Sequence, residues 1–287
     1  MKKIDPRAMR KTISKIKEKK EFSKINDKFI KEELKKYLQE NKKALHAVIE
    51  ERTRSEEYKK AVKAVRAVLR RVYSLFLTKE TKEREDFLEH LKHAPTKLTH
   101  KKILQTHKST KERIPTYPVI YDKIFAITGK PKVILDLGCG LNPVSYPWMG
   151  ITARYYAAEL NEEDCKFLNK YFEIMRIKGK AVQMNLKQAA KNPEMLKVFP
   201  TADVCFLFKV LDEIERKKGR KLSESLIRNI NADWLVISFA TKKVTGKPMK
   251  HPYRRWLEQM LARLGHEYEI IKEGNEILYV VRKSLNR

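Results

Sequence analysis

The sequence predicts an α/β fold, with a Rossmann-like domain in the carboxyl-terminal part of the chain and an all-α helical domain before it. Two observations predict the first of these: apolar segments of strand length alternate with helical segments, and the first strand runs into a glycine turn. A third observation predicts the helical part, since no glycine precedes Gly129 and apolar residues recur there at helical spacing. We therefore expect a helical domain at 1–105 and a Rossmann-like domain at 106–287.

Helical periodicity runs through the first hundred residues. Asp5 followed by Pro6 favours a helix start, because proline fits the first turn of a helix. Three apolar stripes follow at helical spacing, and they comprise Phe29, Ile30, Leu34, Tyr37 and Leu38, then Val62, Val65, Leu69, Val72, Tyr73 and Phe76, and finally Phe87, Leu88 and Leu91. These stripes predict a helical bundle, which 94–113 joins to the second domain.

The most informative motif is the segment 133–143, in which an apolar run reaches Asp136 and then the pair Gly138 and Gly140. Glycine lets the backbone of such a turn pass close to a ligand, and nucleotide-type cofactors bind at this end of the first strand. The third glycine of a dinucleotide fingerprint is replaced here by Leu-Asn-Pro, which favours S-adenosylmethionine over NAD. A turn with a purely structural role is the alternative.

The next two predicted strands also end in polar side chains. The second, 154–160, brings Glu159 to its tip, 23 residues after Asp136, where a carboxylate can accept both hydroxyls of a ribose. The alternative for Glu159 is a charge at the start of the following helix. The third, 181–186, places Asn185 near the edge of an adenine.

The remaining strands complete a sheet. The fourth, 202–208, is buried and is followed by Lys209, and a fifth is expected at 234–240. A closing pair, 267–271 and 276–281, is joined by Glu-Gly-Asn. Strands that alternate with helices predict a mostly parallel sheet, and the final hairpin predicts one antiparallel strand. This is the order of a class I methyltransferase domain.

Charge points to a polyanionic partner. The chain has 64 Lys and Arg against 36 Asp and Glu, a net charge of +28 at pH 7, and residues 1–115 hold 34 basic against 17 acidic side chains. Most of these lysines are expected to be solvated surface charges, but the surplus predicts that the helical domain docks on RNA. The candidates for phosphate contact are Arg66, Arg70 and Arg71 on one exposed flank and Lys11, Lys15 and Lys19 on another.

A membrane is the rival polyanion, but no segment has the apolar length needed to span a bilayer, and 1–5 lacks the apolar core of a signal peptide. Cys139, Cys165 and Cys205 show neither C-x-x-C nor histidine spacing. We therefore expect a cytoplasmic protein in a reducing compartment, with no disulfide and no metal site.

Several blocks follow one another in a fixed order over residues 100–285, and they comprise Thr106–Arg113, Tyr117, Tyr121, Ile124–Phe125, Cys139–Pro143, Pro147–Met149, Phe208–Leu211, Glu215–Arg216 and Val236–Lys242. Together they resemble the 16S ribosomal RNA guanine-N7 methyltransferases that confer aminoglycoside resistance. The Ser-Thr-x-Glu-Arg and Cys-Gly-Leu-Asn-Pro blocks are specific, whereas a generic methyltransferase would share only the glycine turn. The helical domain resembles the helical region of this family in its general arrangement, but it shares no specific sequence motif with it.

The resemblance implies S-adenosyl-L-methionine as the cofactor, and the small ribosomal subunit and its rRNA as the partner of a monomeric enzyme. Arg113 would hold the methionine carboxylate and Glu159 the ribose. Asn185 stands where relatives carry an aspartate that faces the adenine amine, and an amide oxygen accepts the same hydrogen bond.

The resemblance also places Lys209 and Glu215 near the target base. The alternative for Glu215 is a salt bridge with Arg216 or Lys217 within a helix. Relatives carry basic residues against RNA in the loop that here holds Lys242, Lys243 and Lys247. Their Gly-Gly-Arg is Thr-Gly-Lys at 245–247, so no bidentate guanidinium contact is available from that position.

Two motifs that are missing after the fourth predicted strand narrow the possible methyl-transfer reactions. An [ND]-P-P-[YF] loop, typical of transfer to an exocyclic amine, does not follow it, and Cys205 lies inside the apolar run rather than after it. Guanine N7 has a lone pair at neutral pH, so transfer to it needs positioning and electrostatics but neither a general base nor a covalent step. The guanine would have to be flipped out of its helix.

Two classes of function stay open. The first is an rRNA methyltransferase acting on a decoding-region guanine of the small subunit. The second is a non-catalytic RNA-binding or ribosome-assembly protein that keeps a methyltransferase fold. Another RNA, such as tRNA, is a further alternative within the enzyme class, and drug resistance does not follow from the motifs.

Overall fold

The computed structural model describes residues 4–23, 25–70, 83–215, 220–242 and 246–284. The chain divides into two compact units, Met1–Thr78 with Asn161–Glu163, and Lys79–Leu160 with Asp164–Arg287. The predicted helix start at Asp5 is confirmed, because its side chain accepts a hydrogen bond from the Arg7 N–H and Pro6 is the first helical residue.

The first unit is helical, as predicted. It contains α1 (Pro6–Lys17), the short 3-10 helix η1 (Lys20–Phe22), α2 (Asp27–Glu40), α3 (Lys42–Ile49) and α4 (Glu56–Leu69). The apolar stripes of α2 and α4 are buried against the other helices, with Ile30, Leu34 and Leu69 fully so. The stripe residues Val72, Tyr73 and Phe76 lie outside the described residues.

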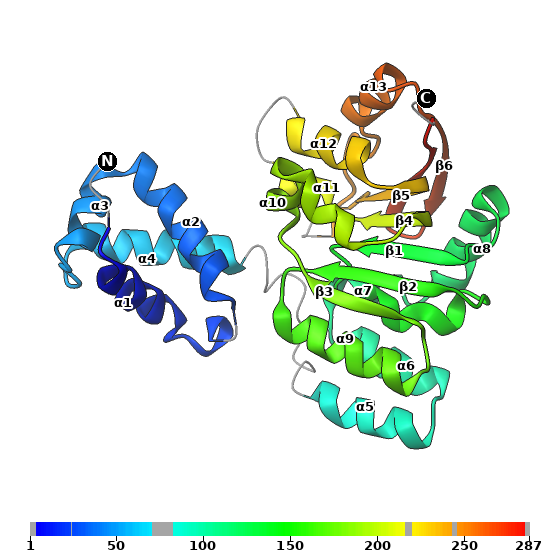
Figure 1. The fold of residues 1–287 in the computed structure, drawn as a ribbon, viewed down its shortest axis with the longest axis horizontal. Coiled ribbons are helices and arrows are strands. Elements are labelled where there is room, and N and C mark those ends of the chain that lie inside the picture. Colours follow the sequence, from blue (N-terminus) through cyan, green and yellow to red (C-terminus); the bar gives the residue numbers. More distant parts are fainter. Residues whose placement is uncertain (1–3, 24, 71–82, 216–219, 243–245, 285–287) are drawn as a thin grey trace. The chain divides into compact units, whose positions relative to one another are not determined.

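The second unit is built on a seven-stranded sheet in the order β3-β2-β1-β4-β5-β7-β6 (Figure 1). Its strands are β1 (Val133–Leu137), β2 (Arg154–Glu159), β3 (Gly179–Gln183), β4 (Ala202–Phe208), β5 (Ala232–Ala240), β6 (Glu267–Glu273) and β7 (Glu276–Arg282). Neighbouring strands from β3 to β5 pair in parallel, and β7 is antiparallel to both β5 and β6. The predicted Rossmann-like sheet with one antiparallel strand is therefore confirmed.

Helices cover both faces of this sheet, so alternate residues of the central strands enter two separate cores. One core joins Ile134, Phe206 and Val280 to one set of helices, and these are α5 (Arg84–His93), α6 (Lys97–Gln105), α8 (Tyr117–Thr128), η4 (Asn142–Trp148) and α9 (Glu162–Ile174). The other core joins Leu135 and Val281 to a second set, namely α10 (Leu186–Lys191), η5 (Pro193–Val198), α11 (Leu211–Ile214), α12 (Lys221–Asn229) and α13 (Arg255–Arg263). Burial on both faces explains the continuous apolar runs of the strands.

The division of the chain differs from the boundary expected after residue 105. Helices α5 and α6 belong to the second unit, because Leu88, Leu91, Ile103 and Leu104 are buried in the first of its two cores. Arg84, a residue that is 6% exposed, also donates hydrogen bonds from its guanidinium to Asp164 and Thr106 within that unit. Amphipathic periodicity identifies a helix but not the core on which it packs.

Cys139, Cys165 and Cys205 are buried free thiols. Burial raises the pKa of both the Cys139 and the Cys205 thiol above the ordinary value of a cysteine, which disfavours the reactive thiolate form. Within the described residues, no helix is both long and apolar enough to cross a bilayer. The same residues contain no group of three or more histidine, cysteine or acidic side chains that could hold a metal ion.

Candidate cofactor and RNA sites

The glycine turn after β1 depends on both of its glycines. Gly138 and Gly140 have φ of 71° and 52°, a conformation that other residues rarely adopt. A Cβ at Gly138 would lie 2.7 Å from Cγ2 of Val210, and one at Gly140 would lie 2.9 Å from Cε1 of His107. Positive φ and close packing against other parts of the same protein therefore both require glycine here.

Glu159 lies beside this turn, because β1 and β2 are adjacent and parallel. Its Oε2 accepts a hydrogen bond from the Gly140 N–H at 2.9 Å, and its Oε1 accepts one from the Leu160 N–H at 2.7 Å. The structure thus brings together the glycine turn and the strand-tip carboxylate that the sequence singled out. Glu159 is half-buried.

Asp136, near the end of β1, is 1% exposed. Its Oδ2 accepts hydrogen bonds from the Tyr155 hydroxyl at 2.7 Å and from Nδ2 of Asn142 at 2.9 Å. Its Oδ1 is buried and has no hydrogen-bond partner among the described residues. Burial raises the pKa of Asp136 to about 6, although the bonds from Tyr155 and Asn142 oppose that shift. A buried carboxylate oxygen without a partner favours the approach of a donor or a cation.

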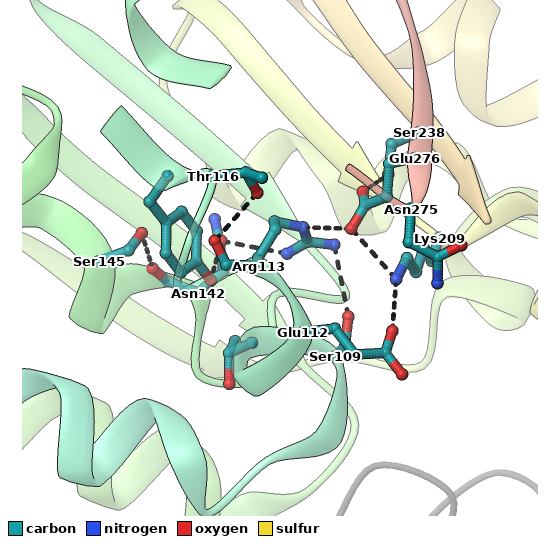
Figure 2. A network of polar contacts seen from close by, with 12 residues as sticks. Ser109, Glu112, Arg113, Thr116, Asn142, Ser145, Lys209, Ser238, Asn275 and Glu276 are labelled. Carbon is teal, nitrogen blue, oxygen red and sulfur yellow. Dashed lines mark hydrogen bonds and ion pairs between the residues drawn. The ribbon is translucent and has the colours of Figure 1, made fainter. Parts of the chain in front are cut away.

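Arg113 ends α7 (Lys108–Arg113) and is 3% exposed. Its Nε donates to Glu276 at 2.7 Å, one terminal nitrogen donates to Oδ1 of Asn142 at 3.3 Å, and the other donates to the Ser109 hydroxyl at 3.4 Å (Figure 2). Its guanidinium also lies 4.7 Å from the ring centroid of Phe208. Burial alone would lower the pKa of Arg113, but the Glu276 carboxylate raises it above its ordinary value, so the side chain is a buried cation.

Lys209 follows β4 with a φ of 60°, a strained conformation for a residue with a side chain. Its ammonium group lies 3.1 Å from carboxylate oxygens of both Glu112 and Glu276, and its side chain is 13% exposed (Figure 2). Burial would raise the pKa of Glu276, but Arg113 and Lys209 together lower it below its ordinary value. Glu276 therefore joins the two cations that the sequence assigned to the cofactor and to the target base.

Two other predicted residues serve as helix caps. The Asn185 side-chain oxygen accepts hydrogen bonds from the Lys187 and Gln188 N–H groups at the start of α10. Oε2 of Glu215, a residue that is 8% exposed, accepts from the Leu222 and Ser223 N–H groups in the first turn of α12. The expected ion-pair alternatives for Glu215, at 216 and 217, lie outside the described residues. The structure thus gives Glu215 a capping contact that neither expectation included.

The predicted RNA-contacting residues fall in separate places. Lys242 and Lys247 are exposed after β5, while Lys243 lies outside the described residues. In the helical unit Arg70 is exposed and pairs with Glu21 at 2.9 Å, and Arg71 lies outside the described residues. Arg66 does not lie on an exposed flank as expected: it is half-buried and donates to the Ile16 and Lys15 carbonyls, so it caps the end of α1.

A groove in the surface of the helical unit gathers positive charge. It lies over Tyr58 and Val62 of α4, both almost fully buried. The basic side chains that line it are Lys15, Lys19, Lys59, Lys63, Arg66 and Arg70. Lys15 and Lys59 pair with glutamates of their own helical segments, whereas Lys19 and Lys63 form no ion pair within the described part of the chain. The groove therefore presents uncompensated charge.

Sequence reasoning missed Glu276, Asn142 and Glu112 as parts of this site. Glu276 carries a signal in hindsight, since a carboxylate at the start of the otherwise apolar run of β7 is costly to bury without a partner. Asn142 was used only as part of a family motif. Glu112 is the glutamate of the Ser-Thr-x-Glu-Arg block, but its contact with Lys209 spans 97 positions of the chain, so the block alone does not indicate that contact.

Curated relatives of the chain share one description, 16S rRNA (guanine(1405)-N(7))-methyltransferase. The enzyme from Micromonospora rosea is 26% identical over 234 residues, 78% of this chain and 82% of the relative. The enzyme from Serratia marcescens is 26% identical over 243 residues, 82% of this chain and 88% of the relative. The match to the enzyme from Frankia casuarinae is 27% identical over 184 residues, 63% of this chain, and spans 62% of that relative's length.

Solved structures show the same fold. The 16S rRNA methyltransferase RmtF in complex with S-adenosyl-L-homocysteine matches with a TM-score of 0.79 and 22% identity, over 98% of this chain and 100% of that one. The 16S rRNA methylase RmtB matches with a TM-score of 0.70 and 20% identity, over 96% of this chain and 98% of that one. The predicted class of fold, a class I methyltransferase domain preceded by helices, is confirmed.

The model of one protein family, described as ribosomal RNA methyltransferase (FmrO), matches residues 35–280. This match covers most of the second unit and much of the first, well over half of the 287 residues. The chain therefore belongs to the ribosomal RNA methyltransferase (FmrO) family.

Proposed function

We propose that this protein is an S-adenosyl-L-methionine-dependent methyltransferase that modifies N7 of a guanine in the decoding region of small-subunit rRNA, and that it works as a cytoplasmic monomer. The observation that carries the proposal is the meeting of three features at the carboxyl ends of β1, β2 and β4. These are the glycine turn held by Glu159, the buried pair of Arg113 and Asp136 on either side of Asn142, and Lys209 held by Glu276.

The side chains at this edge fit the cofactor. The Arg113 guanidinium has five N–H groups, of which three make the hydrogen bonds described above, so two can bind a carboxylate. The unpartnered Oδ1 of Asp136 can accept from an ammonium group. Glu159, at the tip of β2 beside the glycine turn, is placed to accept from the two hydroxyls of a ribose. The backbone near Asn185, at the end of β3, would face the adenine.

S-adenosylmethionine supplies an electrophilic methyl group when it is bound. The protein then has to hold guanine N7 in line with that methyl group and to keep water out, since the N7 lone pair is available at neutral pH. Methylation leaves a positive charge on the base. The carboxylates of Glu112 and Glu276, which lie beside Lys209, reduce the electrostatic cost of that charge.

Lys209 is the residue proposed to contact the target nucleotide. Its two carboxylate partners hold the ammonium group in one place, and its strained φ fixes the direction in which the side chain leaves the end of β4. Glu215 contributes to this region by capping α12 rather than by contact with the base. We therefore assign Glu215 a supporting part in the site.

RNA docking is proposed for two surfaces. The groove of the helical unit binds phosphates through Lys19 and Lys63, while Arg66 and Arg70 are tied to α1 and η1 and shape the groove. Lys242 and Lys247, exposed after β5 in the second unit, form the other surface. The net charge of +28 supports a polyanionic partner for these surfaces.

A non-catalytic RNA-binding protein with this fold is the alternative. A buried carboxylate with an unpartnered oxygen, next to a buried guanidinium, is costly to maintain without a ligand, and this favours the enzyme. The test is incubation of the protein with labelled S-adenosylmethionine and, separately, small subunits, whole ribosomes and tRNA. We expect label on small-subunit rRNA. Label on tRNA alone would assign a different substrate, and no label on any RNA would support the non-catalytic alternative.

A further inference from the structure

Asn142 is the point at which the polar groups around the cofactor site meet. It is 1% exposed and opens η4, directly after the glycine turn. Its Oδ1 lies 3.3 Å from a terminal nitrogen of Arg113 (Figure 2). The same oxygen lies 3.1 Å from the Tyr117 hydroxyl and 3.4 Å from the Tyr121 hydroxyl. Its Nδ2 lies 2.9 Å from Oδ2 of Asp136. One amide group therefore connects the buried cation to the buried carboxylate.

The chemistry of its neighbours fixes the orientation of this amide. Arg113 can only donate hydrogen bonds, and an ionised Asp136 can only accept them. The oxygen of Asn142 must therefore face Arg113, and its nitrogen must face Asp136. An aspartate at this position would bring a second carboxylate next to the Asp136 carboxylate. An apolar residue would leave Arg113 and Asp136 without the hydrogen bonds that Asn142 makes to them.

Asn142 also determines which oxygen of Asp136 is left for a ligand. Both Asn142 and Tyr155 donate to Oδ2, and Oδ1 has no hydrogen-bond partner among the described residues. On the other side, the bond from Arg113 to Asn142 and the bond to Glu276 hold the guanidinium at two of its nitrogens. The Arg113 guanidinium and the Asp136 carboxylate, on opposite sides of this amide, have the charges needed to bind the two ends of an amino acid. The guanidinium would pair with its carboxylate, and Asp136 would pair with its ammonium group.

We propose that Asn142 is a positioning residue, which holds Arg113 and Asp136 in the relation that receives the amino acid end of the cofactor. The proposal rests on the proposed function, because it takes S-adenosylmethionine as the ligand. It concerns one end of that ligand only. The adenosine end lies with Glu159 and the glycine turn, and among the described residues the Asn142 side chain forms no hydrogen bond with either of them.

Because Asn142 concerns only the amino acid end of the cofactor, two ligands that differ at that end can test the proposal. S-adenosylhomocysteine and 5′-methylthioadenosine share the adenosine and the sulfur, but only the first has the carboxylate and the ammonium group. Both ligands are titrated calorimetrically into the full-length wild type and into Asn142→Asp. Binding of S-adenosylhomocysteine to the variant should be weaker by about tenfold or more, because Asp136 loses its hydrogen-bond donor and faces a second carboxylate. Binding of 5′-methylthioadenosine should stay within about twofold. The matched control is Asn192→Asp, the same change at an exposed asparagine, which should alter neither affinity.

Binding of 5′-methylthioadenosine also reports that the site is folded. The variant Asn142→Ser removes the amide bonds to both Arg113 and Asp136 without adding a charge, and it should show the same selective loss. Unchanged affinity for S-adenosylhomocysteine in both variants, or an equal loss of both ligands, would overturn the proposal. If the wild type itself binds neither ligand, the proposed function fails instead, and the two failures are thus distinguished.

Discussion

At the scale of single residues, the site is built from buried charges that neutralise one another. Glu276 lies between Arg113 and Lys209, and each of the three side chains is at most 13% exposed. Burying such groups is tolerable only because each is paired and hydrogen-bonded. The Ser238 hydroxyl completes the set by donating to the second oxygen of Glu276 at 2.8 Å. The arrangement holds the two cations in place.

Glu159 provides the first prediction. The variant Glu159→Ala should weaken S-adenosylhomocysteine binding by about 1–3 kcal/mol, because it leaves buried ribose hydroxyls unpaired and removes the acceptor of the Gly140 N–H. Glu159→Gln retains one oxygen and should lose less. Calorimetry measures both effects, and thermal unfolding of the ligand-free variants controls for damage to the turn. Wild-type affinity in Glu159→Ala would exclude the ribose contact.

Asp136 provides a prediction of pH dependence. Burial raises the pKa of its carboxyl group to about 6, and only the ionised form attracts an ammonium group. The ionised fraction falls as the pH drops through that value, so S-adenosylhomocysteine should bind roughly tenfold more weakly at pH 5 than at pH 7.5. Binding of 5′-methylthioadenosine, which has no ammonium group, should not show this decrease. An equal decrease for both ligands would place the titrating group elsewhere.

At the scale of elements, the structure explains which features could be predicted. The strands β1, β4, β5 and β7 were predictable because each contains an apolar run that is largely buried on both faces. The placement of α5 in the second unit was not, because it depends on Arg84 reaching Asp164, 80 positions away. The role of Glu276 was hidden for the same reason, since its contact with Arg113 spans 163 positions. Local pattern identifies elements, and long-range pairing decides what they do.

The anchoring of α5 gives a prediction of stability. Arg84→Met leaves Asp164 without its buried ionic partner, so the free energy of unfolding should fall by about 3–5 kcal/mol. Lys170→Met is the matched control, because Lys170 pairs with Glu85 of the same helix, but with both side chains exposed, and it should cost less than about 1 kcal/mol. Urea unfolding of both variants measures the difference. Equal midpoints would show that the Arg84 pair does not anchor α5.

At the scale of the whole molecule, the excess of positive charge governs association with RNA. Binding to small subunits should weaken steeply with salt, and the log–log slope should fall by about one for each phosphate contact removed. We expect this decrease for Lys19→Gln and for Lys63→Gln, which line the groove. Lys28→Gln, an exposed lysine outside the groove, should leave the slope unchanged. Filter binding over a range of salt concentrations provides the measurement. Slopes that are the same in all three variants would exclude the groove.

The central claim is that the protein methylates guanine N7 in small-subunit rRNA. Methylation at N7 gives the base a fixed positive charge and makes its glycosidic bond labile after reduction. The most direct measurement is therefore treatment of reacted rRNA with borohydride and aniline, followed by primer extension. We predict cleavage at a single guanine in the decoding region, which is absent without S-adenosylmethionine and strongly reduced with Lys209→Ala. A methyl group found by mass spectrometry on a ribose or on an exocyclic amine, with no chain cleavage, would contradict the account.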